Sequence, residues 1–294
     1  MSEKKFSQEF LSAALSLANK KSVDKLLYVS DIPPPWEEVK KRRLKAKIVH
    51  ATSNPSNVES TEKMGGVAVH IPTFVVSRVE RIKLALASAI SKGKIKNDDI
   101  VLCLTGKDES SPLDTIVSMV IGKEFDSRLD YKKLTEGGDT QPAILEGIIA
   151  LAHKIGYEGY EGKPLGTILV VGDSVRVMEN SRQITLNPFQ GYPESERNIM
   201  DPTITDAIRS FSSIDGAFVI RGDGIVLAAG RYLVTPEGTD VEIPMGLGAR
   251  HAAAALISRF TNAIAVVVSQ TSGTVRVFHK GKIAIELKQE KRRS

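Results

Sequence analysis

The spacing of apolar positions changes repeatedly between a helical and a strand period over the first part of the chain. Residues 7–20, 36–45 and 75–92 have apolar positions at helical spacing, and short strand-like runs lie between them in KLLYVSDI, AKIVHATS, GGVAVHIP and DDIVLCLTG. Strands that alternate with helices predict a mostly parallel sheet with helices packed on it. The apolar run LDTIVSMVIG (113–122) suits either a short helix or a buried strand.

This alternation stops near residue 126, where the segment EFDSRLDYKKLTEGGDT is polar and contains glycines. Such a segment is typical of a domain boundary. A chain of 294 residues is long enough for two domains of ordinary size. We therefore predict an α/β domain over residues 1–125 and a second domain over residues 126–294.

The second part of the chain is dominated by strands that follow one another closely. A helix over 141–155 leads into the strand TILVVGD, and a proline-rich segment (SRQITLNPFQGYPESERNIMDPTI) predicts irregular structure. After a helix over 203–213, two strands flank Gly222-Asp223-Gly224, which indicates a hairpin. Three further strands lie in AIAVVVSQTSGTVRVFHKGKIAIEL. This pattern predicts an α+β domain with a mixed, largely antiparallel sheet surrounded by helices.

The composition is that of a soluble globular protein, with 41% hydrophobic and 26% charged residues. The chain lacks the run of about 18 apolar residues that a membrane span requires. Its N-terminal segment reads as an amphipathic helix rather than a secretory signal. The single cysteine, Cys103, excludes an intrachain disulfide framework and fits a reducing compartment, so we expect a cytoplasmic protein and a buried thiol.

The net charge of +5 is concentrated in two basic runs, residues 40–47 (KKRRLKAK) and 288–294 (KQEKRRS). Basic runs can bind nucleic acid or phosphates. Neither run is interleaved with the aromatic residues that stack on bases, which favours a solvated face and a terminal tail. We expect no membrane among the partners and do not favour nucleic acid, but a nucleic-acid-binding module that uses these two runs is a rival hypothesis, for which binding should depend strongly on salt and not on Asp215.

Three short segments carry candidate chemistry. Asp215-Gly216-Ala217 lies where a helix gives way to a strand, and its carboxylate can hold a divalent metal or take a proton. In PMGLGARHAAAALISRF, the turn Gly246-Leu247-Gly248 opens a helix whose first N–H groups, with Arg250 and His251, suit a phosphate. The segment Ser269–Gly273 gathers hydroxyls and an amide at a strand end.

Each segment also has a structural interpretation: a turn at Asp215, a helix-start histidine at 251 and an ordinary hairpin over 269–273. Taken together, a carboxylate, a phosphate cradle and a hydroxyl cluster in one domain predict a nucleotide site with a metal. The residue types alone do not decide whether the nucleotide is bound or transformed.

A family resemblance goes further. The second part of the chain resembles the diadenylate cyclase domain, which carries a DGA motif followed by RHR within GTRHR. The segments that carry the resemblance are, in order, DGAFVI, GARHAAA and VVVSQTSGTVRVFHKGKI. The resemblance covers residues 127–290, and the paired motifs in this order are specific. Residues 1–125 more weakly resemble the C-terminal α/β domain of pyruvate kinase, and the combination resembles the soluble archaeal diadenylate cyclases.

The resemblance implies that two ATP molecules become cyclic di-AMP and two diphosphates at a site formed by two facing domains of a homo-oligomer. It implies Mn²⁺ or Mg²⁺ on Asp215 and catalytic roles for Asp215, Arg250 and His251. It also implies an ATP site that comprises Gly216, Ala217, Leu233, Gly248, Ala249, Arg250, His251, Ala252, Ser269, Gln270 and Thr271. The N-terminal domain would then serve oligomerisation or regulation.

Two positions depart from the family pattern. The second arginine of RHR is Ala252, and a glutamate often found after the strand-end serine is Gln270. Either departure could weaken ATP binding, or another basic residue could replace the arginine. The alternative hypothesis is therefore a catalytically weak sensor of a nucleotide or of cyclic di-AMP.

Overall fold

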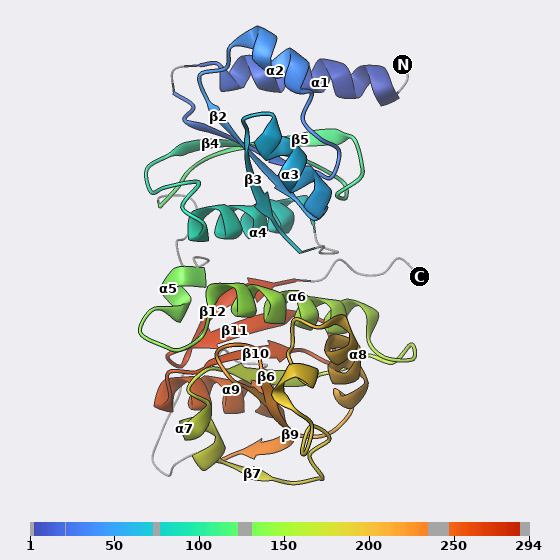
Figure 1. Cartoon of the computed structure of the whole chain (residues 1–294), viewed down its shortest axis with the longest axis vertical. Coiled ribbons are helices and arrows are strands. Elements are labelled where there is room, and N and C mark those ends of the chain that lie inside the picture. The colour runs from blue at the N-terminus through green and yellow to red at the C-terminus, as the bar shows by residue number, and fades with distance from the viewer. Residues whose placement is uncertain (1–2, 21, 73–76, 123–130, 235–246, 289–294) are drawn as a thin grey trace. The chain divides into compact units, whose positions relative to one another are not determined.

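The computed structural model describes residues 3–20, 22–72, 77–122, 131–234 and 247–288. The chain divides into two compact units, Met1–Asp130 and Tyr131–Ser294 (Figure 1). The boundary predicted between residues 125 and 126 lies outside the described residues.

The first unit contains a five-stranded sheet with the strand order β3-β2-β1-β4-β5. The first four strands in the chain run parallel, and β5 pairs antiparallel with β4 at the sheet edge. The predicted mostly parallel sheet is confirmed, and most of the ambiguous run 113–122 is a strand. The strands are β1 (Lys25–Val29), β2 (Lys47–Thr52), β3 (Val67–His70), β4 (Ile100–Gly106) and β5 (Leu113–Val120).

The helices of this unit are α1 (Glu3–Ala18), α2 (Trp36–Arg42), α3 (Pro55–Lys63) and α4 (Arg78–Ser91). The first part of the basic run 40–47 lies on α2, where Arg42 donates to Glu38 and to Ser12 of α1. Part of this charge therefore stabilises the packing of two helices. The end of the second basic run, residues 289–294, lies outside the described residues.

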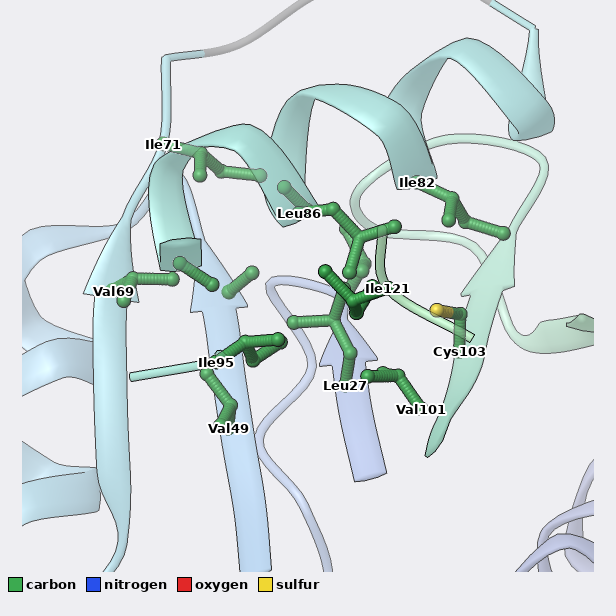
Figure 2. Close-up of a cluster of buried hydrophobic side chains, with 14 residues drawn as sticks. Leu27, Val49, Val69, Ile71, Ile82, Leu86, Ile95, Val101, Cys103 and Ile121 are labelled. Carbon is green, nitrogen blue, oxygen red and sulfur yellow. The ribbon is translucent and has the colours of Figure 1, made fainter. Parts of the chain in front are cut away.

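One face of this sheet packs against α4 in an apolar core (Figure 2). Cys103 lies fully buried in that core. Burial raises the pKa of the Cys103 thiol to about 12, so the reactive thiolate is not formed near neutral pH. This confirms the expected structural role for the cysteine.

The second unit contains a seven-stranded sheet with the order β12-β11-β10-β6-β8-β9-β7. Neighbouring strands pair antiparallel except β6 and β8, which are parallel. The predicted mixed, largely antiparallel sheet is confirmed. The strands are β6 (Thr167–Val171), β7 (Ser181–Gln183), β8 (Ala217–Ile220), β9 (Val226–Leu233), β10 (Ile264–Val268), β11 (Val275–His279) and β12 (Lys282–Leu287).

Helices α6 and α9 cover opposite faces of the central strands (Figure 1). The alanine-rich sequence of α9 allows a close approach to the sheet, where Ala254 and Ala255 are fully buried in the core. None of the helices in the described part of the chain is long and apolar enough to cross a membrane. The helices are α5 (Tyr131–Thr135), α6 (Pro142–Glu158), α7 (Ser174–Glu179), α8 (Pro202–Phe211) and α9 (Ala249–Phe260), with a 3-10 helix η2 (Glu194–Glu196).

Candidate active site

Several strands of the second sheet begin or end at the same edge. Strands β6 and β8 begin there because they are parallel, and β9 and β10 end there because each pairs antiparallel with one of them. A cavity of about 950 Å³ lies at this edge, next to the start of α9. Residues from segments far apart in the chain therefore line one space.

The structure brings all the site residues predicted from the sequence to this cavity. The roles that the family resemblance implies for them stay predictions. The predicted residues that line the cavity are Asp215, Gly216, Ala217, Leu233, Gly248, Ala249, Arg250, His251, Ala252, Ser269, Gln270 and Thr271.

Gly216 determines how the Asp215 carboxylate is presented. Its φ of 106° lies in the region that favours glycine. A Cβ at this position would lie 2.7 Å from the backbone nitrogen of Arg231 and 2.7 Å from the carbonyl carbon of Gly230. The strand β9 can therefore pass closely behind position 216, while the Asp215 side chain is 90% exposed at the start of β8.

The first turn of α9 faces the cavity with its N–H groups. Gly248 precedes the helix with extended backbone, and its carbonyl accepts the first hydrogen bonds, from the N–H groups of His251 and Ala252. The N–H groups of Ala249 and Arg250 thus stand ahead of the hydrogen-bonded ladder. Together with the positive end of the helix dipole, they suit an anion.

Arg250 links two of the predicted segments. Its Nη2 atom lies 3.7 Å from Oδ1 of Asp215, and its Nη1 atom donates to Oε1 of Gln270 at 3.4 Å. Gly166, just before β6, leaves room for this arrangement, since a Cβ there would lie 2.8 Å from Cβ of Gln270. The guanidinium is half-exposed between a carboxylate and an amide, where it can turn to a bound anion.

His251 lies deeper in the site than Arg250. Nη1 of Arg276 lies 3.3 Å from Nε2 of His251, and Phe278 packs edge-on against the ring. Burial, then the charges of Arg276 and Arg250, lower the pKa of His251. An arginine can only donate, so Nε2 is the acceptor and the neutral ring carries its proton on Nδ1. His251 can donate to a ligand only through Nδ1.

The lining and supporting residues that sequence reasoning missed include Gly166, Arg231 and Arg276. Arg231 donates to the carbonyls of Met178 and Ser181, so it serves mainly to hold the chain before β7. Arg276 is more informative. A single charged residue in the apolar run VRVFH is a signal for one side chain that faces away from the core, but its neighbours depend on how β11 pairs.

Apolar side chains complete the lining, among them Ile168, Leu233, Leu247, Leu256 and Val268. Leu233 is buried in the same core cluster as Ile168 and Ala217. An apolar wall beside a group of cations and N–H donors suits a ligand with an aromatic base and phosphates.

The donor set fits a metal that is shared with a ligand. Among the described residues, no group of three or more His, Cys, Asp or Glu side chains is arranged to hold a metal ion. Asp215 is the single carboxylate among the described residues that line the cavity. Mg²⁺ is commonly bound by one or two carboxylates together with substrate phosphates and water, so one exposed carboxylate is sufficient.

Comparisons with known proteins identify the family of the second unit. Residues 154–283 match the family described as "DisA bacterial checkpoint controller nucleotide-binding". A diadenylate cyclase of Methanocaldococcus jannaschii is 38% identical over 245 residues, which make up 82% of this chain and 77% of that protein. A diadenylate cyclase of Haloferax volcanii is 33% identical over 222 residues, or 76% of this chain and 80% of that protein.

Residues 7–127 match a different family, described as "Probable sensor domain DacZ_P". The expected likeness of residues 1–125 to pyruvate kinase is not confirmed by this match. Among solved structures, a double mutant of DacA from Staphylococcus aureus is 21% identical and covers 48% of this chain and 84% of its own, with a TM-score of 0.35. That score is too low to bear on the fold.

Proposed function

The chain belongs to the diadenylate cyclase family, and we propose that it condenses two ATP molecules into cyclic di-AMP with release of two diphosphates. The observation that carries this proposal is the convergence of the DGA segment, the start of α9 and the strand-end hydroxyls on one cavity. These are the groups that attack on a phosphate requires: a proton acceptor, fixed donors for the phosphate and a wall for the base.

Each group has a defined task. The N–H groups at the start of α9, with Arg250 and Nδ1 of His251, hold the phosphates, and the wall that includes Leu233 contacts the adenine. Asp215 accepts the proton of the attacking 3′-hydroxyl. The 3′-oxygen forms a bond to the α-phosphorus of the other ATP as the bond from that phosphorus to the diphosphate breaks.

Asp215 also holds the Mg²⁺ or Mn²⁺ ion. When bound, the metal neutralises charge on the triphosphate and makes the hydroxyl more acidic. The exposed position of the Asp215 carboxylate leaves it accessible to both the metal and the nucleotide.

Cyclic di-AMP contains two new bonds, whereas one cavity supplies one set of these groups. The active form is therefore a homo-oligomer in which the cavities of two copies face each other. Two large side chains at the rim, Ile184 and Tyr232, are 45% and 52% exposed, which supports a contact there with a second copy. The N-terminal unit has an oligomerisation or regulatory role, and the expected compartment is the cytoplasm.

A second candidate function is a catalytically weak sensor that binds ATP or cyclic di-AMP. Ala252 and Gln270 favour it, because each removes a charge that the family pattern usually has at this site. Binding and turnover are therefore tested separately.

The proposal is tested by incubating the purified protein with ATP and Mn²⁺ or Mg²⁺ and detecting cyclic di-AMP by mass spectrometry. We expect Asp215→Asn to lower the rate by about a hundredfold or more while the fold survives, because it removes the charge but keeps the shape. The matched control is Asp206→Asn, an exposed carboxylate on α8, which should leave the rate unchanged. ATP that binds but stays intact with both metals would establish the sensor.

A further inference from the structure

We propose that Arg276 of β11 is a phosphate-binding residue of this site and supplies the guanidinium that position 252 lacks. This inference rests on the proposed function, since it assigns a contact to the nucleotide that the cyclase would use. The sequence left open whether another basic residue replaces the arginine that is missing at position 252. Arg276 would be that residue, and it comes from a strand distant in sequence.

Arg276 and position 252 lie beside the same histidine. Ala252 follows His251 in α9, and Nη1 of Arg276 approaches Nε2 of His251 to 3.3 Å from the strand side. Both Ala252 and Arg276 line the cavity. The methyl side chain of Ala252 leaves space that a longer side chain would fill, and a guanidinium from β11 enters the same neighbourhood.

The guanidinium of Arg276 is fixed yet incompletely used. Its Nε atom donates to Oε2 of Glu286 on β12 at 2.6 Å, and the side chain is only 16% exposed. Its Nη2 group has no protein acceptor in the part of the chain that the structure describes. A guanidinium has five donors in a rigid fork, so Arg276 retains donors for a phosphate while Glu286 holds its orientation.

The positive groups gathered beside His251 also suit an anion. Burial lowers the pKa of His251 most, and the charges of Arg276 and Arg250 lower it further, whereas the charge of Glu286 raises it. The start of α9 adds the positive end of a helix dipole at the same place. A polyanion such as a triphosphate would be attracted to this place.

The competing explanation is structural. Arg276 and Glu286 are direct cross-strand partners, and such a pair can serve only to stabilise the sheet. The two explanations differ in what the partner does. If the ion pair itself matters, removing either charge has the same effect. If Arg276 binds phosphate, loss of the guanidinium weakens ATP binding far more than loss of the Glu286 charge, because the amide in Glu286→Gln can still accept the hydrogen bond from Nε.

The test measures binding of ATP and of adenosine by calorimetry without divalent metal, for the wild-type protein, Arg276→Gln and Glu286→Gln. We expect Arg276→Gln to raise the Kd for ATP about 10- to 100-fold, the range for a hydrogen bond to a charged group. Adenosine affinity should stay within about twofold, because nucleoside and base do not contact Arg276. Glu286→Gln should raise the Kd for ATP less than about threefold.

Two further variants sharpen the result. Arg276→Lys keeps the charge but loses the fork, and it should give an intermediate ATP affinity; it also replaces Arg276→Gln if that variant does not fold. Adding Ala252→Arg to Arg276→Gln should restore most of the ATP affinity. Unchanged ATP affinity in Arg276→Gln, or equal losses of ATP and adenosine affinity in both single variants, would overturn the inference. Wild-type protein that binds ATP without forming cyclic di-AMP would overturn the proposed function alone.

Discussion

Two glycines next to the proposed catalytic groups have opposite surroundings. A Cβ on Gly216 would meet the backbone of β9, whereas a Cβ on Gly248 would have no atom of the described chain within 4 Å. Gly216 also has a positive φ, and Gly248 has an ordinary extended conformation with φ of −80°. Gly216 is therefore required by the fold, whereas no steric contact with the described chain requires a glycine at position 248.

We expect Gly216→Ala to lower the thermal midpoint of unfolding strongly and to abolish cyclic di-AMP formation, because backbone cannot rotate away as a side chain can. A destabilisation of about 2–3 kcal/mol is reasonable for a strained backbone position. Differential scanning calorimetry measures the stability, and mass spectrometry measures the product.

Gly248→Ala is the matched control. It should lower the unfolding midpoint far less than Gly216→Ala does, and it should raise the KM for ATP, since the added methyl group would stand beside the N–H groups that are proposed to hold the phosphates. A large loss of stability in Gly248→Ala, or none in Gly216→Ala, would contradict this account of the two positions.

The sequence predicted that Asp215, Arg250 and His251 lie together, because each belongs to a short motif whose polar side chains lie at the end of a helix or strand. Arg276 and Gly166 could not be predicted in this way. The contacts of Arg276 and Gly166 depend on the pairing of β11 with β12 and on the side chains that α9 places at the sheet edge. Strand spacing predicts which face a residue occupies, but not the residue opposite it.

At the scale of an element, α6 carries an ionisable group on its buried face. His153 is 2% exposed, and burial lowers its pKa to about 4. The ring is therefore neutral in the folded protein at pH 7. In the unfolded chain a histidine takes up a proton near pH 6.5. Below this pH the unfolded state binds more protons than the folded state. The free energy of unfolding therefore decreases as the pH is lowered.

We expect the free energy of unfolding of the second unit to fall by about 3 kcal/mol between pH 7 and pH 4 through His153 alone. The variant His153→Gln should lack this part of the pH dependence. Denaturant unfolding followed by circular dichroism from pH 7 to pH 4 measures the difference between the two proteins. His70→Gln, at an exposed position on β3, should leave the slope as in the wild type. Equal slopes for the wild type and His153→Gln would contradict the prediction.

Elements with a clear apolar pattern were predictable, and some without one were not. Helices α4 and α6 and strands β6 and β10 bury many apolar side chains, which produces the periodic pattern. By contrast, α3 buries only Asn57 and Thr61 and is initiated by the Asn54 cap, and β7 is a three-residue strand at the sheet edge. Caps and edge pairing form these elements without an apolar stripe.

At the scale of the whole molecule, the proposed reaction requires two copies. Each ATP is attacked by the hydroxyl of the other, so a pair with one Asp215→Asn subunit can form at most one of the two bonds. Mixing this variant with the wild-type protein under conditions of subunit exchange should lower cyclic di-AMP more than dilution predicts. The linear one-bond intermediate should accumulate.

The measurement is product and intermediate by mass spectrometry against the mixing ratio, with exchange shown independently by labelled subunits. The control mixture contains Asp206→Asn in place of Asp215→Asn and should give constant product. Cyclic product that falls only in proportion to the wild-type fraction would mean that one chain contains a complete active site.

The hydrogen bond from Arg276 to Glu286 restricts the rotamers of the Arg276 side chain before any ligand binds. A free arginine side chain loses about 2 kcal/mol of rotamer entropy when it becomes ordered. An arginine on the first turn of α9 would lose that freedom as the nucleotide binds. Arg276 is already ordered by its 2.6 Å hydrogen bond to Glu286 and by its position beside His251. The ordering thus occurs during folding, and a phosphate bound as proposed would meet a guanidinium that has little entropy left to lose.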